Sequence, residues 1–146
     1  MDIRDLVTAD ALPALAATMR FAARRQPLIA HNIANASTPE FRPIDVSPKV
    51  FQRELARAVD ARREHLGGVR GALQIRSTQA FTVDEGGRFE LHPSASGAGV
   101  LFHDRNDRDL ERLMQDQVEN ASAFRLSAML FRSRMDLLNS AISERV

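Results

Sequence analysis

The chain has 146 residues, of which 44% are hydrophobic and 27% charged, and its formal net charge is +1. This length suits one folded unit over residues 1–146, and the composition excludes wholesale disorder and a protein with many membrane spans. Because cysteine is absent, disulfides, thiolate catalysis and cysteine-bound metals are excluded. The near-neutral charge does not favour binding to nucleic acid or to an anionic membrane, and we expect no nucleic-acid partner. Arg20, Arg24 and Arg25 interrupt the longest apolar region, so we expect no membrane insertion.

An amphipathic helix is predicted at residues 10–37. Hydrophobic side chains recur there at heptad spacing, interrupted only by Gln26. Pro27 has no amide donor, so we expect the helix to kink or divide near it. Pro39 disfavours helical geometry at Thr38, so the helix should end between residues 35 and 37. No basic stretch leads into an apolar one at the amino terminus, and we therefore expect no cleavable signal peptide.

Residues 38–105 form a variable middle, which we expect to be glycine-rich and irregular or to contain a small β-hairpin. A short amphipathic stretch at residues 49–64 fits a second helix. Alternating residues at 72–75, 81–83 and 89–91 fit extended chain, and the turn residues at 85–88 favour a hairpin between the last two. All seven glycines of the chain lie between Gly67 and Gly99.

A long helix is predicted at residues 106–145, because glycine and proline are absent from Asp107 onward. Asn106 is a candidate cap for its first turn. We expect the two terminal helices to pack as an antiparallel, coiled-coil-like pair in a mainly α, elongated molecule. Hydrophobic residues again recur at heptad spacing, and those assigned to an assembly interface are Leu110, Met114, Phe124, Phe131, Met135, Leu138 and Ile142.

Candidate chemistry is sparse in this sequence. The four histidines lie in separate segments without paired ligand spacing, so no metal site is predicted. Nucleophile-elbow and phosphate-loop motifs are absent, and we predict no catalytic residue and no cofactor. The arginine pairs at 24–25 and 62–63 are interpreted as solvated helix faces with acidic neighbours, because no aromatic residues interleave with them to stack bases.

Two asparagines, Asn32 and Asn35, stand near the end of an otherwise apolar helix. One interpretation is a polar carboxy-terminal turn, followed by an extended chain after Pro39. The other places both amides across a helix interface, where they fix the register against a second helix. We expect the second, although their spacing alone does not choose.

The same segment resembles the amino-terminal signature of the bacterial flagellar basal-body rod protein family, Asn-Ile-Ala-Asn-Ala-x-Thr-Pro-Gly-Tyr/Phe. The chain matches it over residues 32–41, with Glu40 in place of the usual glycine. Short length and the residue series at 45–55 and 106–124 are most similar to the proximal rod subunits of the family. The matching positions assigned to the assembly interface are Asn32, Ile33, Asn35, Thr38 and Pro39.

The resemblance implies a structural subunit that catalyses no reaction and needs no cofactor. Its implied partners are other flagellar rod and basal-body proteins, copies of itself and the flagellar type III export apparatus. Its implied location is the rod that spans the periplasm, reached without signal-peptide cleavage. The alternatives are a generic coiled-coil adaptor, another rod-type axial subunit, a small export-associated factor, and an enzyme with a pocket at His92 or His103.

Overall fold

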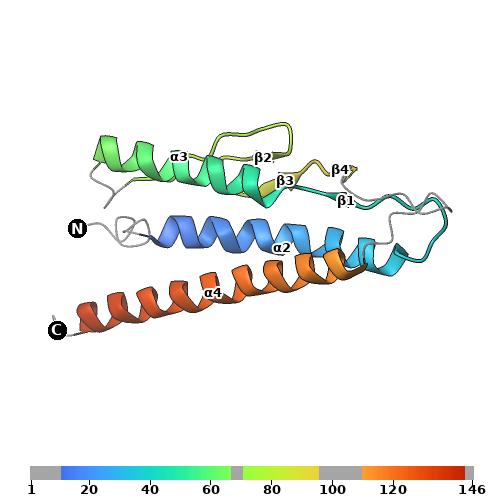
Figure 1. The fold of residues 1–146 in the computed structure, drawn as a ribbon. Helices are drawn as coiled ribbons and strands as arrows, with labels where there is room; N and C mark the ends of the chain where they lie inside the picture. Colours follow the sequence, from blue (N-terminus) through green and yellow to red (C-terminus); the bar gives the residue numbers. More distant parts are fainter. Residues whose placement is uncertain (1–10, 67–70, 96–109, 144–146) are drawn as a thin grey trace.

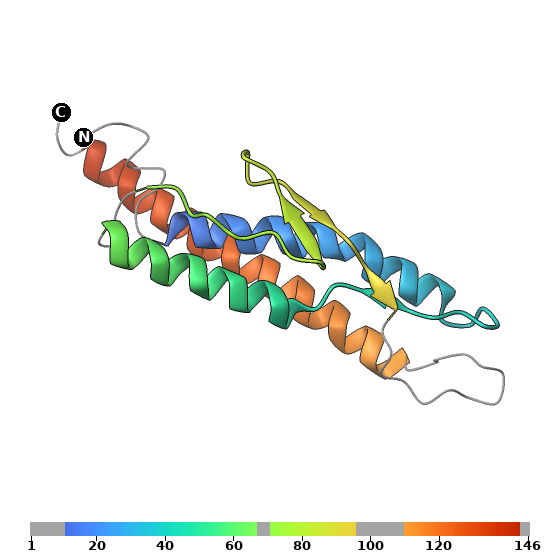
Figure 2. The same ribbon diagram turned by 90° about the horizontal axis from the view of Figure 1, so that it is seen from above.

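The structure, a computed structural model, describes residues 11–66, 71–95 and 110–143 and is mainly helical. In Figure 1, helix α2 lies between α4 on one side and α3 with the strands on the other, in an elongated arrangement that Figure 2 shows from above. The predicted mainly α class is confirmed. In chain order the elements are α2 (Leu12–Asn35), β1 (Ile44–Asp45), α3 (Pro48–Leu66), β2 (Phe81–Val83), β3 (Phe89–Leu91), β4 (Ser94–Ala95) and α4 (Leu110–Ser143).

The two long helices, α2 and α4, pack against each other and run in opposite directions (Figure 1). Helix α2 continues through Pro27, so the predicted division there is wrong, and it ends at Asn35 within the expected range. Helix α4 has 34 described residues and is therefore about 50 Å long. The predicted cap at Asn106 and the other positions at 106–109 and 144–145 lie outside the described residues. Within the described ranges, no helix is both long and apolar enough to cross a membrane.

The described part of the middle segment, residues 38–66 and 71–95, contains one helix and two strand pairings. Helix α3 covers the predicted 49–64 stretch, and β2 and β3 form the predicted antiparallel hairpin, with Phe81 opposite Leu91. Gly87 adopts a φ of 71° in the turn, and its amide donates to the Asp84 carbonyl at 2.9 Å. A glycine suits this position because positive φ is strained for other residues. A second pairing joins β1 to β4, while the stretch at 72–75 forms no strand.

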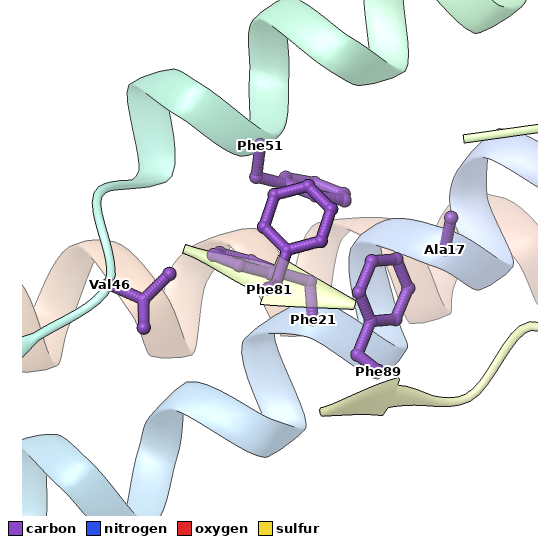
Figure 3. Packing of buried hydrophobic residues seen from close by; sticks show 6 residues of the cluster. All are labelled: Ala17, Phe21, Val46, Phe51, Phe81 and Phe89. Carbon is purple, nitrogen blue, oxygen red and sulfur yellow. The ribbon is translucent and has the colours of Figure 1, made fainter. Parts of the chain in front are cut away.

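A cluster of aromatic rings attaches the middle segment to α2 (Figure 3). Phe21 of α2 stacks on Phe51 of α3, with ring centroids 4.1 Å apart and planes within 4°. The rings of Phe81 and Phe89 contact this pair edge-on, as aromatic quadrupoles favour. Each of three separate segments thus contributes to one core. Its buried members are Ala17, Phe21, Val46, Phe51, Phe81 and Phe89.

Candidate functional site

The signature asparagine Asn32 is buried, with only 2% of its surface exposed, and holds strand β1 against α2. Its Nδ2 donates to the Ile44 carbonyl at 2.8 Å, and its Oδ1 accepts from the Ile44 amide at 3.1 Å. The side-chain amide therefore pairs with one backbone residue through both of its polar atoms, as a neighbouring strand would. This contact ties the end of α2 to the segment that follows the signature turn.

Asn35 behaves differently from Asn32. Its Nδ2 donates to the His31 carbonyl at 2.9 Å, one turn back in its own helix, and the side chain is partly exposed. The expectation that both amides donate across a helix–helix interface is wrong for the folded chain. Asn32 bonds to a strand because β1 returns along the end of α2, and Asn35 bonds within its own helix and forms the polar turn.

The two asparagines should respond differently to aspartate. In Asn32→Asp the carboxylate cannot donate to the Ile44 carbonyl and adds a buried charge, so we expect a loss of about 2 to 3 kcal/mol in the free energy of unfolding. In Asn35→Asp, at the partly exposed helix end, we expect a change within about 0.5 kcal/mol. Urea unfolding of both variants checks this, and equal losses would contradict the clamp at Asn32.

The chain after α2 makes a tight turn over residues 38–41. The Phe41 amide donates to the Thr38 carbonyl at 3.2 Å, and Glu40 has a φ of 60°. Proline at the second position and positive φ at the third define a type II turn, which normally carries glycine at the third position. Glu40 therefore occupies the position where such a turn normally carries glycine, in a backbone conformation strained for a glutamate.

We expect Glu40→Gly to stabilise the protein by about 0.5 to 1 kcal/mol. The left-handed conformation costs a non-glycine residue about 1 to 2 kcal/mol, which exceeds the extra entropy that glycine loses on folding, about 0.5 to 1 kcal/mol. Thermal unfolding measures the effect. Glu40→Ala serves as the control, because it removes the same side chain while keeping the strain, and an equal gain from alanine would contradict the backbone explanation.

Arg25 joins three elements in the interior. It is 2% exposed, and its guanidinium contacts both carboxylate oxygens of Asp45 in β1 and, through Nη2, an oxygen of Asp116 in α4 at 2.9 Å. A planar guanidinium suits this arrangement because its fork of donors matches a carboxylate in two places at once. The bridge links α2 to both β1 and α4.

Arg25 keeps its positive charge in this buried position. Burial alone lowers its pKa, but hydrogen bonds and charges of Asp45 and Asp116 outweigh burial and raise the pKa above the ordinary value for arginine. Because the folded-state pKa is raised, the positive charge of Arg25 contributes its full stability below the unfolded pKa and is lost only in strong alkali. The interaction is therefore present throughout the neutral range.

The interpretation of the arginine pairs as solvated faces is confirmed for one member of each pair and wrong for the other. Arg24 is exposed, and exposed Arg63 lies 3.7 Å from Asp60, as expected. Arg25 and Arg62 are buried instead. Adjacent helix positions point about 100° apart, so one member of each pair reaches the solvent while the other turns toward the interior.

A second set of polar contacts connects α2 and α4 beside this bridge. Gln26 Nε2 donates to Gln117 Oε1 at 2.8 Å. Asn120, only 5% exposed, donates to the Ala22 carbonyl at 3.0 Å and to Gln26 Oε1 at 2.8 Å. Together with the contact between Arg25 and Asp116, these bonds are called the polar ladder below. Gln26 interrupts the predicted apolar spacing of its helix, and in the folded chain it bonds to Gln117 across the interface.

The face that α4 turns toward α2 overlaps the predicted seam without being identical to it. The most buried positions are Leu113, Asn120 and Ser127, whereas the predicted Met114 is 46% exposed. The periodicity assigned exposed residues such as Met114 to the seam because α4 carries apolar residues on more than one side. Buried polar contacts identify the side that faces α2.

The residues assigned to the assembly interface fall into two groups in the folded chain. Asn32 is buried and Ile33 and Asn35 are partly buried, so they serve the fold of the single chain, whereas Thr38 and Pro39 are exposed at the turn. On α4, three of the assigned residues, Phe131, Met135 and Leu138, are partly buried. Those left exposed on α4 are Leu110, Met114, Phe124 and Ile142.

The histidines do not form a site in the described part of the chain. His31 contacts the Phe41 ring edge-on, while His65 and His92 are exposed in separate segments, and His103 lies outside the described residues. No group of three or more residues that could hold a metal ion occurs among the residues described.

A scan of protein-family models and a search of curated proteins both find no match to this chain. The two features of the chain that bear on its function are the signature at residues 32–41 and the surface of α4.

Proposed function

We propose that this chain is a structural subunit of the bacterial flagellar basal-body rod, most like the proximal rod protein FlgB. In this proposal it assembles through its terminal helices with copies of itself and with other axial proteins, and it catalyses no reaction. It would reach the periplasm-spanning rod through the flagellar type III export apparatus, without signal-peptide cleavage. The signature over residues 32–41 supports the family, and the surface of α4 supports assembly.

The observation that carries the proposal is the distribution of exposed apolar side chains. Among the described residues, every large hydrophobic residue that is exposed lies on α4. Exposed apolar side chains that gather on one element of a protein mark an interaction surface. A long helix with such a surface suits lateral packing against other helices. The exposed residues are Leu110, Met114, Val118, Phe124, Leu126, Met129, Leu130, Leu137 and Ile142.

The architecture suits a load-bearing role. Helices α2 and α4 are both long and antiparallel, and the polar ladder with the Arg25 bridge binds them to β1 within one chain (Figure 1). In an array of parallel subunits, each α4 would bury its apolar surface against neighbours. Torque would then be distributed over many helix–helix interfaces, rather than borne by one joint.

The carboxy-terminal part favours the FlgB type over FlgC, another rod-type axial subunit with a similar amino-terminal signature. FlgC-type chains usually carry Ser/Ala-Arg-x-Tyr-x-x-Asn near the carboxy terminus, and residues 123–126, Ala-Phe-Arg-Leu, do not reproduce it.

The test replaces exposed leucines on α4 and asks whether the rod still forms. Leu126→Gln, Leu130→Gln and Leu137→Gln are combined in a flagellated strain that lacks its own proximal rod protein and is complemented by this chain. We expect normal export but loss of rod incorporation and of swimming, because these side chains are exposed and the fold does not need them. Purified basal bodies and secreted fractions are probed for the protein.

A matched control places the same amide side chain on another exposed helix surface, at Ala56→Gln with Ala61→Gln on α3. This control should complement as the unmodified chain does. Normal rod incorporation of the leucine variant would overturn the proposal. An unmodified chain that fails to enter the rod and forms a closed oligomer of fixed size would instead indicate a coiled-coil adaptor.

A further inference from the structure

Apolar burial alone leaves two candidate sides of α4 for the contact with α2. One side holds Leu113, which is 6% exposed, with Phe131 and Leu138 partly buried, and the other holds Leu126, Leu130 and Leu137. Asn120 and Ser127 are 5% and 6% exposed on the inward side, while Leu126 and Leu137 are 54% and 60% exposed elsewhere on the same helix. Burial of apolar surface is favourable and has no directional preference. That effect alone gives no reason to bury Asn120 while leucines of the same helix stay exposed.

A modest rotation would produce that alternative. Leu126, Leu130 and Leu137 form one stripe, named the leucine stripe, which at 100° per residue lies about 100° around the helix from Asn120. Turning α4 about its axis by one residue step would bring the leucine stripe onto α2. The observed rotation therefore needs a specific physical cause.

The polar ladder supplies a cause with the required geometry. It spans neighbouring turns of both helices, from Ala22, Arg25 and Gln26 on α2 to Asp116, Gln117 and Asn120 on α4. Rotation by one step would break each of these bonds at once. It would leave Gln26 without its two partners and Arg25 without one carboxylate, and unpaired buried polar groups are costly.

We infer that the polar ladder acts as a rotational lock on α4. It selects the inward face of a helix that has apolar residues on two sides, and it keeps the leucine stripe on the outside. Single buried polar residues fix register in coiled coils by the same principle, at some cost in stability. This inference concerns one folded chain and is independent of the rod proposal.

Thiol labelling tests the rotational lock. The chain contains no cysteine, so only the introduced thiol reacts. Ser127→Cys reports the inward side and Ala123→Cys an exposed position beside the leucine stripe. With the ladder intact, we expect the Ser127→Cys thiol to react at least about tenfold more slowly, as a buried position in a stable helix should. Rates are measured with a maleimide on the full chain and extrapolated to low protein concentration, so that self-association does not contribute.

The ladder is then replaced by Gln26→Leu, Gln117→Leu and Asn120→Leu. We expect the labelling ratio to fall to near one or to reverse, while far-UV circular dichroism keeps its helical signal, because apolar replacements in a helix interface are often tolerated. Asn120→Leu alone is measured in parallel and should lower the ratio in the same direction. If the triple variant unfolds, the labelling ratio of Asn120→Leu decides whether the polar ladder sets the rotation of α4.

The control triple, Gln52→Leu, Gln115→Leu and Asn139→Leu, changes the same residue types at exposed positions and should leave the ratio unchanged. An unchanged ratio in the folded ladder variants would overturn the lock, since the rotation would then be set by the remaining apolar contacts. A drop of equal size in the control would overturn it as well.

Discussion

Replacing Phe21 by alanine is expected to lower the free energy of unfolding by about 3 to 5 kcal/mol. Phe21 is 4% exposed, and its ring contacts Phe51, Phe81 and Phe89. Removing it takes away the surface on which α3 and the hairpin both rest. Because the surrounding rings come from separate segments, they cannot all move in to fill the space. Urea unfolding followed by far-UV circular dichroism measures the loss.

The same substitution at Phe124 provides a matched control. Phe124 lies on α4 and is 39% exposed, so Phe124→Ala should cost the isolated chain no more than about 1 kcal/mol. The pair of variants also separates folding from assembly, because Phe124 belongs to the predicted assembly interface. Comparable losses at both positions would mean that the aromatic cluster is not the stabilising core that its geometry indicates.

Replacing Arg25 by methionine should cost about 3 kcal/mol. Removing one partner of a buried ion pair costs about 3 to 5 kcal/mol, and partial exposure of Asp45 and Asp116, 21% and 28% of their side chains, places this case at the lower end. The variant leaves two carboxylates near each other without a cation. Methionine has a similar length and no charge, so the loss reports the bridge rather than a change of volume.

Two controls define the effect at Arg25. Arg24→Met, one position earlier and exposed, should change the free energy of unfolding by less than about 0.5 kcal/mol. Arg25→Lys should fall between methionine and the unmodified chain, because an ammonium keeps the charge but cannot donate in a planar fork to Asp45. If lysine restores full stability, charge alone is sufficient and the forked geometry contributes nothing.

Local features of the sequence predict where most of the helices and the hairpin begin and end. Pro39 ends α2, because it disfavours helical geometry at the residue before it. The absence of glycine and proline allows α4 to run without interruption through its described length. The turn residues at 85–88 form the hairpin they predict, and Gly87 takes the positive φ that the turn requires. Pro27 is the exception, since α2 passes through it undivided.

The roles of polar residues depend on partners that lie far away along the chain. Asn32 bonds to Ile44, twelve positions on, and Arg25 reaches Asp116 across the α2–α4 contact. No spacing rule for a single helix identifies such partners, because the return path of β1 and the approach of α4 create them. The resemblance to the rod family includes Asn32, but it does not imply the contact that Asn32 makes with Ile44.

Heptad periodicity by itself determined that this chain has two long amphipathic helices and that they should pair. It did not determine which side of α4 faces inward, because apolar residues occupy more than one side of that helix. Tertiary structure decided this through the hydrogen bonds of Asn120 and Gln26, which are directional, whereas hydrophobic burial is not. In the same way, four rings from three segments became one core only when α3 and the hairpin returned to α2.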